Sequence, residues 1–404
     1  MDKKQIPVGE LKLGMYVTEF DRPWLGTQVL SQGFLITSTE QIDEVKKHCQ
    51  TVFIDLERGA SVDDPRGADG GSPVVRGTVV YKEVTPVEQE LVVAKEVYSA
   101  VEESVAASLE SVRTTGELDP KPLTHAVDGM TRSIERNPDA MMLLHRIKQK
   151  GGEEFDRAVD TSAVDTAIHM TTFGRFLQFP GERLELLGLA GLLLDIGKVK
   201  LPDAILQQRD VLTKDEYELS KSHVMHSVEL IRAAAGLPKG LDEIVLQHHE
   251  RQDGSGYPRG LSGRQITIDG AIAGLVNSYS ALTSKRGYVE QNSPSNALSK
   301  LYKLRGKLFH EALVEQFIQC VGIYPVGSTV ELNTGEVGIV IAQNLVRRLQ
   351  PRVMVVLDAA WKPIRPPLIL DLIKEPKAAE DEPYRIRRTL PGDKVPINPE
   401  EFFL

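Results

Sequence analysis

Apolar residues recur at three- and four-residue spacing, with few β-branched runs, over residues 121–321. This is the period of an amphipathic α-helix, so an all-helical domain is expected there. Thr213 followed three residues later by Glu216 forms the pattern of a capping box, which predicts the start of one of its helices. The fold class expected for the chain is therefore mainly α.

A further helix is predicted ahead of this domain, over residues 85–120, as a connecting helix. Thr85, Pro86 and Glu88 offer an N-cap, a proline at the first helical position and a glutamate three residues after the cap. One face then stays apolar, through Leu91, Ala94, Tyr98, Val101, Val105 and Val112. We interpret this stripe as packing on the next domain, and pairing with its copy in a homodimer is the alternative.

Strand-like patterns flank the helical part at both ends. Residues 1–57 mix short β-rich runs with one helical segment, which predicts a small α/β module. Three β-rich runs with an Asn-Thr-Gly turn signal predict a small β-rich appendage over residues 322–375. Between the first two parts, residues 58–84 are expected to form a linker. The charged, Pro-rich residues 376–404 are expected to form a loosely held tail.

Composition narrows the class of protein. Hydrophobic residues make up 41% and charged residues 26%, and no run of about 18 apolar residues indicates a membrane span. The first residues lead into no apolar signal segment, so a cytoplasmic location is expected. A net charge of -9 argues against binding of a nucleic acid polymer. Because only Cys49 and Cys320 are present, neither a disulfide framework nor a cysteine-based zinc site is expected.

Residue types that bind metals gather in the helical part. Asp165 and His169 stand four residues apart on one predicted helix face, so both side chains can reach one ion. Asp195 directly follows an apolar run. A carboxylate in that place is costly to bury unless it binds a cation or pairs with Lys198, three residues further on.

Histidines add to this group from other predicted helices. His223 comes from one of them, and His248 and His249 end another. A single histidine is more often a surface or core residue than a ligand, but a His-His pair followed by Glu-Arg-x-Asp-Gly is hard to explain by packing. Imidazoles combined with carboxylates suit Fe, Mn, Zn or Ni rather than Mg or Ca. His226, one turn from His223, is interpreted as exposed.

The order of these residues resembles the HD-GYP family. The matching segments are Leu194-Asp195-Ile196-Gly197-Lys198, then Leu201-Pro202-Asp203, then His223, then His248-His249-Glu250-Arg251, and then Asp253-Gly254-Ser255-Gly256-Tyr257-Pro258. The family is a helical branch of the HD metal-dependent phosphohydrolases, and its best-known activity is hydrolysis of cyclic di-GMP by a metal-activated water. The resemblance covers roughly residues 160–320, and the flanking parts look like those of many HD-GYP proteins.

The resemblance implies a role for each matching residue. One metal ion, iron or manganese, would be held by the complete site, which consists of Asp195, His223, His248 and His249. Asp195 and Lys198 would take part in catalysis. The cyclic dinucleotide would meet Gly256, Tyr257, Pro258 and Arg286, the first three forming the GYP loop. A basic position of the family is Val289 here, so one phosphate contact is expected to be missing.

The departures from the family affect a second metal position, the degraded site. Leu194 stands where the family has a histidine, Asn277 where it has an aspartate, and the shorter Asp165 where a glutamate can recruit a third metal. His169 and Asp195 alone remain, so this ion is expected to bind weakly. Two hypotheses follow: an impaired cyclic di-GMP phosphodiesterase, or a non-catalytic module that binds cyclic di-GMP or a GGDEF-domain protein through the GYP loop.

Overall fold

The structure is a computed structural model that describes most of the chain. It covers residues 3–12, 15–20, 34–36, 42, 45–46, 50–55, 74–151, 158–206, 212–284, 292–344, 347–379 and 382–390. The chain divides into two compact units, Met1–Val75 and Arg76–Leu404, and each is described by itself. Arg286 and Val289 lie outside the described residues.

The first unit is a small antiparallel sheet with strand order β1-β4-β2-β3. Its strands are β1 (Lys3–Pro7), β2 (Tyr16–Phe20), β3 (Phe34–Leu35) and β4 (Thr51–Asp55), with a 3-10 turn, η1, at Val8–Glu10. Alternate residues such as Ile6, Val52 and Ile54 face a common core and are at most 1% exposed. The strand-rich character predicted for this end is confirmed.

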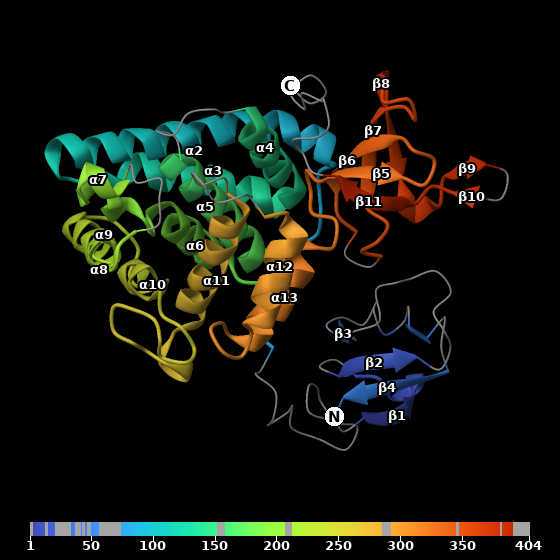
Figure 1. Ribbon diagram of the computed structural model, residues 1–404, viewed down its shortest axis with the longest axis horizontal. Coiled ribbons are helices and arrows are strands. Elements are labelled where there is room, and N and C mark those ends of the chain that lie inside the picture. The colour runs from blue at the N-terminus through green and yellow to red at the C-terminus, as the bar shows by residue number, and fades with distance from the viewer. Residues whose placement is uncertain are drawn as a thin grey trace. The chain divides into compact units, whose positions relative to one another are not determined.

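The second unit begins with a helical part, which confirms the mainly α fold (Figure 1). Its helices are α2 (Val87–Thr115), α3 (Pro120–Arg136), α4 (Pro138–Gly151), α5 (Ala158–Phe176), α6 (Gly181–Leu193), α7 (Asp203–Leu206), α8 (Lys214–Ser220), α9 (His223–Ala233), α10 (Leu241–Gln247), α11 (Ile268–Thr283), α12 (Pro294–Lys303) and α13 (Glu311–Val321). Short 3-10 turns, η4 (Ile196–Lys200) and η5 (Gly263–Gln265), join some of them. None of the described helices is long and apolar enough to cross a membrane.

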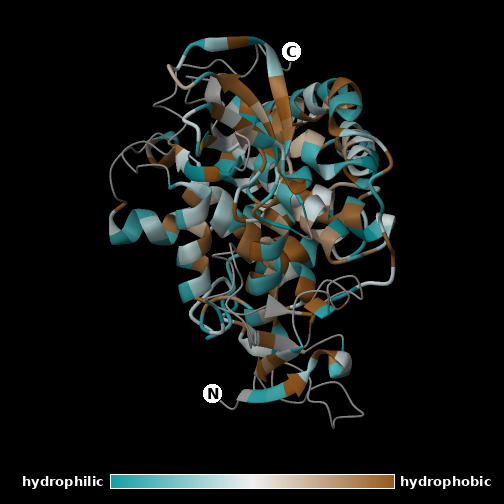
Figure 2. Cartoon of the chain, turned by 90° about the vertical axis from the view of Figure 1, so that its right-hand side faces the viewer, coloured by the Kyte–Doolittle hydropathy of each residue, from teal (hydrophilic) through white to brown (hydrophobic). Residues whose placement is uncertain are grey.

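Helix α5 lies at the centre of this part. It packs against α2, α3, α4, α6, α11 and α13, and residues 164–171 are buried all round. The surrounding helices alternate hydrophobic and hydrophilic positions along their length, as Figure 2 shows. Such helices bury one face and leave the other in water. Helix α5 is therefore the buried element on which the neighbouring helices pack.

Helix α2 packs within the chain through its apolar stripe. Tyr98 and Val101 are each 1% exposed, and the helix contacts α3, α4 and α5. The predicted cap at Thr85 is wrong, because Pro86 is the N-cap residue and no side chain caps this helix. The Thr85 carbonyl instead accepts a hydrogen bond from Asn137 (2.8 Å). The capping box at Thr213, by contrast, is confirmed at the start of α8.

The segment before α2 is attached to the helical part, in contrast to the linker expected over residues 58–84. The Gly77 N–H donates to the Leu177 carbonyl (2.7 Å), and the Tyr81 hydroxyl donates to the Phe179 carbonyl (2.6 Å). Backbone groups of residues 76–84 thus find partners that a free linker would leave to water. Residues 58–73 of the expected linker lie outside the described part.

A five-stranded antiparallel sheet follows the helices, in the order β11-β5-β6-β7-β8. Its strands are β5 (Thr329–Leu332), β6 (Val337–Ala342), β7 (Arg352–Leu357), β8 (Pro363–Asp371) and β11 (Ile386–Leu390), and β9 (Lys377–Ala379) pairs with β10 (Glu382–Pro383). Because β11 pairs with β5, the prediction of a loose tail is wrong for residues 386–390. The β-rich appendage itself is confirmed. Residues 391–404 lie outside the described part.

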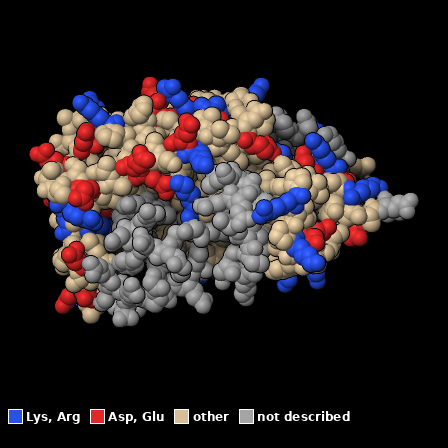
Figure 3. All heavy atoms as spheres, turned by 90° about the horizontal axis from the view of Figure 1, so that it is seen from above, with Lys and Arg blue, Asp and Glu red and all other residues tan. Residues whose placement is uncertain are grey.

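Charge on the surface is mixed where it can be seen. On the face shown in Figure 3, basic and acidic side chains are interspersed among uncharged ones. A nucleic-acid-binding surface would instead gather Lys and Arg on one face. This view is consistent with the net charge of -9.

Candidate metal centre

Four predicted ligands come together at the ends of three helices. Asp195 follows α6, His223 begins α9, and His248 and His249 follow α10. One ligand atom from each residue lies within 4.8 Å of the ligand atoms of the other three. The Asp195 Oδ1 is 3.2 Å from His223 Nε2 and 3.8 Å from His248 Nε2. This spacing matches donor atoms arranged around one ion of the size of a transition metal.

Hydrogen bonds on the far side of two imidazoles orient them towards this point. His223 Nδ1 lies 2.6 Å from the Ser220 carbonyl, and His248 Nδ1 lies 2.5 Å from the Val245 carbonyl. A carbonyl can only accept, so each Nδ1 carries the proton and each Nε2 keeps its lone pair. Both Nε2 atoms and Asp195 Oδ1 are buried and lack a hydrogen bond within the described structure. A buried polar atom without a hydrogen-bond partner lowers the free energy of unfolding. One cation shared by these three atoms would satisfy all of them.

Electrostatics favour the protonation states that bind a metal. Burial lowers the pKa of His248 to about 4. Burial, together with the neighbouring His248, also lowers the pKa of His249 well below its usual value. Burial acts to raise the pKa of Asp195, but Lys198 and His223 outweigh it and hold that pKa well below its usual value. Neutral imidazoles and an ionised carboxylate are the forms that coordinate a divalent ion.

The turn that carries Asp195 is fixed against α9. Ser227 donates to the Leu194 carbonyl (3.0 Å) and accepts from the Gly197 N–H (2.8 Å). A Cβ added at Gly197 would lie 2.2 Å from the His223 carbonyl oxygen, so only glycine fits. Ser227 therefore ties the Asp195 turn to the helix that begins with His223.

The residues expected at the degraded site lie on α5, at the end of α6 and on α11. Leu194 is 1% exposed and offers only an apolar side chain. Asn277 lies half-buried on α11. His169 is buried on α5 and its Nε2 has no hydrogen-bond partner among described residues, but it does not belong to the four-residue group. Two positions of this site therefore provide no imidazole or carboxylate.

Asp165 takes part in a different cluster, which the sequence analysis missed. Its Oδ1 lies 2.7 Å from His145 Nε2 and 3.1 Å from His169 Nδ1. Tyr98 contacts the other nitrogen of His145 at 3.0 Å. Burial acts to raise the pKa of Asp165, but His169 and His145 outweigh it and hold the pKa well below its usual value. One feature of the sequence could have indicated this cluster. His145 directly follows the apolar run Met141–Leu144, just as Asp195 directly follows an apolar run.

His226 also differs from expectation. Its side chain is 31% exposed, and its Nδ1 lies 3.5 Å from Glu229. The interpretation of this histidine as exposed is therefore wrong, and half-buried describes it better. It is not part of the four-residue group.

The GYP loop is organised around the Glu250 carboxylate. Glu250 accepts from the backbone N–H groups of Arg259 (2.7 Å) and Leu261 (2.8 Å). A Cβ on Gly256 would come within 2.5 Å of the backbone of residues 249–251, so this glycine serves the packing of the loop. Tyr257 thereby stacks on the candidate ligand His249, with ring centres 4.6 Å apart. Pro258 is exposed beside it.

Two basic residues of this region are already engaged. The Lys198 ammonium lies 2.7 Å from Asp195 Oδ2, next to the complete site. Arg251 donates to the carbonyls of His248 (3.1 Å) and Glu250 (2.8 Å), so its guanidinium holds the loop. Lys198 therefore places a positive charge beside a candidate ligand, while Arg251 has a structural role.

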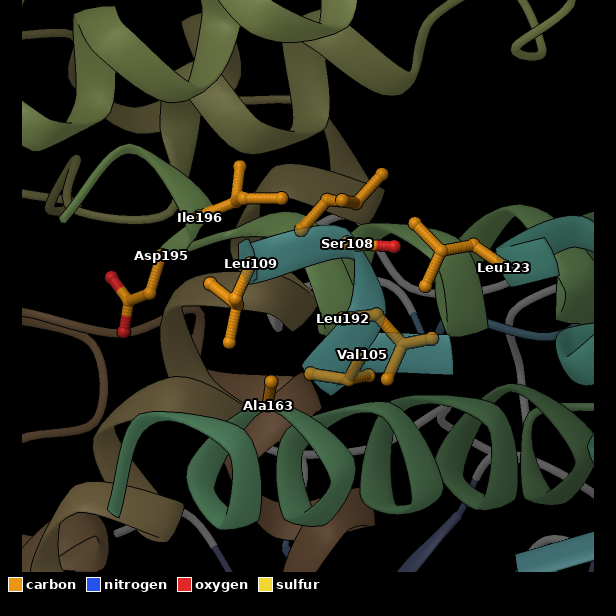
Figure 4. Close-up of a pocket in the computed structure, with 9 residues that line it drawn as sticks. Val105, Ser108, Leu109, Leu123, Ala163, Leu192, Asp195 and Ile196 are labelled. Carbon is orange, nitrogen blue, oxygen red and sulfur yellow. The ribbon is translucent and has the colours of Figure 1, made fainter. Parts of the chain in front are cut away.

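The apolar wall behind Asp195 is not a ligand pocket. A cavity of about 10 Å³ lies between α2, α3, α5 and α6, and Val105, Leu109 and Leu192 are among the residues that line it. Figure 4 shows the Asp195 carboxylate pointing away from these apolar side chains. A cavity of this size holds at most one water molecule. The apolar side of Asp195 therefore has no room for a ligand in this cavity.

Comparisons with known proteins cover nearly the whole chain. Residues 146–313 match the family described as HD domain, and residues 3–123 match a domain of unknown function, DUF3391. Over 373 residues the chain is 29% identical to a cyclic di-GMP phosphodiesterase of Pseudomonas aeruginosa, covering 91% of this chain and 89% of that protein.

Other relatives match a shorter stretch of the chain. A cyclic di-GMP phosphodiesterase of Thermotoga maritima is 39% identical over 126 residues, which are 31% of this chain and 34% of that protein. A 3'3'-cGAMP-specific phosphodiesterase of Vibrio cholerae is 35% identical over 126 residues, 31% of this chain and 24% of that protein. The chain thus spans most of the Pseudomonas protein but about a third or less of these two.

Proposed function

The chain belongs to the HD-GYP family, and from that premise we propose that it is a cyclic di-GMP phosphodiesterase weakened by the loss of two metal ligands. The observation that carries the proposal is the contrast between the complete site, with four converging ligands, and the degraded site, with Leu194 and Asn277. The names of the relatives support the substrate. The HD domain supports metal-dependent phosphohydrolase chemistry.

The donor set of the complete site fits a divalent transition metal. Asp195, His223, His248 and His249 would hold it, and three imidazoles with one carboxylate suit iron or manganese. When bound, such an ion supplies Lewis-acid polarisation of the phosphoryl group and a water of lowered pKa. The orphaned Nε2 atoms and the carboxylate oxygen are the structural features that support this assignment.

Residues beside the ligands have tasks of their own. Lys198 orients Asp195 through its 2.7 Å contact and places a positive charge where the phosphoryl oxygens gain negative charge. Burial raises the pKa of Tyr257, so its hydroxyl stays protonated and can donate to a phosphate or a base. Water is excluded on one side by the apolar wall that contains Leu109 and Leu192.

Weak turnover is expected because a two-metal mechanism divides its work between the ions. In such a mechanism the two ions would together lower the pKa of the attacking water and stabilise negative charge on the attacking and leaving oxygens. Leu194 has no donor atom and Asn277 has only a neutral carbonyl. Phosphodiesters resist hydrolysis strongly, so loss of one ion is expected to lower the rate by orders of magnitude.

A non-catalytic binding module is the second candidate function. Asp165 contacts His145 and His169, and Asp195 is paired with Lys198, so both carboxylates have partners without a metal. Such a domain would keep the GYP loop for cyclic di-GMP or for a GGDEF-domain protein. It would show ligand binding without turnover.

Metal analysis combined with a turnover assay tests these alternatives. Protein purified without oxygen in the presence of iron or manganese is assayed with cyclic di-GMP, alongside His248→Ala and the matched control His226→Ala. Metal-dependent hydrolysis that is lost in His248→Ala and kept in His226→Ala supports the phosphodiesterase. Binding of cyclic di-GMP with no metal-dependent hydrolysis in the parent supports the binding module and contradicts the enzyme.

A further inference from the structure

A cation and two aromatic rings connect α8 to the complete site. Lys221 Nζ lies 4.7 Å from the centre of the Tyr217 ring and 5.3 Å from the centre of the Tyr257 ring. Tyr257 in turn stacks on His249 at 4.6 Å, with the rings 25° apart. These direct contacts lead from the exposed surface of α8 to a candidate metal ligand. We call Tyr217, Lys221 and Tyr257 the α8 cluster.

The outer part of the α8 cluster is open to solvent. Tyr217 is 48% exposed, and the Lys221 side chain is 26% exposed. An aromatic ring exposed to this degree can stack on another planar π-system. Every kind of nucleobase can stack on such a ring, because each has a planar π-face. An exposed tyrosine within reach of a metal ligand therefore has the chemistry of a base-stacking surface.

Lys221 has a weak partner that a phosphate can replace. Its Nζ lies 2.7 Å from Glu218, whose side chain is 58% exposed. An exposed ion pair of this kind contributes little to stability, whereas an ammonium–phosphate hydrogen bond is charge-assisted and stronger. The backbone of Lys221 is held near the ligands, because this residue caps the C-terminus of α8 two residues before His223.

We propose that the α8 cluster is a nucleotide subsite, in which Lys221 contacts a phosphoryl oxygen and Tyr217 stacks on a base. The inference rests on the proposed function, since the ligand class is a cyclic purine dinucleotide. One phosphodiester reaches the complete site, and the α8 cluster holds the neighbouring nucleotide. Lys221 thereby supplies a positive charge in a chain where Val289 replaces a basic residue of the family pattern.

Calorimetric titration of cyclic di-GMP into the metal-loaded full-length protein tests the subsite. Lys221→Met removes the charge and keeps the aliphatic stem, and it is expected to weaken binding by about tenfold or more. Tyr217→Ala is expected to weaken binding by about fivefold or more, whereas Tyr217→Phe keeps the ring and binds like the parent. Lys214→Met, a charge-matched change on the same helix, is the control and leaves affinity unchanged.

The outcomes separate this inference from the function on which it rests. Metal content is measured on every variant and is expected to equal that of the parent, because the α8 cluster holds no metal ligand. If the parent binds cyclic di-GMP while Lys221→Met and Tyr217→Ala bind it within about twofold of the parent, the subsite is wrong and the proposed function stands. If the metal-loaded parent binds no cyclic di-GMP, both are wrong.

Discussion

Restoring the two lost ligands is a direct perturbation of the degraded site. The double variant Leu194→His with Asn277→Asp returns an imidazole and a carboxylate to the ligand set that the family pattern shares with His169 and Asp195. The His169 Nε2 is buried and has no hydrogen-bond partner among the described residues, so this nitrogen is available to an ion. We expect the variant to bind two ions and to hydrolyse cyclic di-GMP faster than the parent.

The magnitude of the accompanying stability change follows from the burial of Leu194. A leucine side chain that is 1% exposed contributes about 1.5–3 kcal/mol through burial. An imidazole without a partner in that place costs about 1–3 kcal/mol more. Without metal, Leu194→His is therefore expected to lower the free energy of unfolding by about 2.5–6 kcal/mol. Metal at a hundred times its Kd should return about 2.7 kcal/mol.

Thermal unfolding with a chelator or with manganese measures this change, and turnover is measured on the same samples. Each single variant should gain little activity, because both ligands act through one ion and their effects are coupled. A folded double variant that binds two ions and yet turns over no faster than the parent would refute the reasoning. The defect would then lie in ligand recognition, or the domain would be a binding module.

Two further predictions concern the surroundings of the site. Ser227→Ala leaves the buried Gly197 N–H and the Leu194 carbonyl without their hydrogen-bond partner. We expect it to lower the free energy of unfolding by about 1–3 kcal/mol, measured by denaturant unfolding, and to weaken metal affinity, measured by metal titration. Unchanged values in both measurements would contradict the role of Ser227 in holding the Asp195 turn. Burial raises the pKa of Asp139 to about 7, above its pKa in the unfolded chain. The folded state therefore binds a proton more tightly than the unfolded state, and the free energy of unfolding falls as the pH rises towards and through about 7. The side chain in Asp139→Asn is neutral at every pH, so the melting temperature of the variant minus that of the parent should be larger at pH 8 than at pH 5. The same difference at both pH values would show that this carboxyl does not titrate as described.

The helical domain and the complete site were predictable because their signals are local. Apolar periodicity marked α5 and α6, and the motif that contains His248 and His249 has few structural explanations. Asp195 was identified for a physical reason, namely a carboxylate directly after an apolar run. What brings these residues within 4.8 Å of one another is the packing of α6, α9 and α10, which no local pattern encodes.

Long-range pairing explains what the sequence analysis missed. His145 lies on α4 and meets Asp165 on α5 across a segment of the chain that carries no motif. β11 pairs with β5, more than fifty residues earlier in the chain. The charged and Pro-rich composition of this segment predicted a loose tail and gave no sign of the strand. The predicted N-cap of α2 at Thr85 is wrong, and the Thr85 carbonyl accepts a hydrogen bond from Asn137, which is distant in sequence. In each case a tertiary contact overrides the local preference.

Metal stoichiometry tests the central claim most directly. Protein purified anaerobically with iron or manganese is analysed for bound metal per chain, in the parent and in His248→Ala. We predict about one tightly held ion in the parent and almost none in His248→Ala, because only Asp195, His223, His248 and His249 form a complete ligand set. Two tightly held ions per parent chain, or one that survives in His248→Ala, would contradict the account.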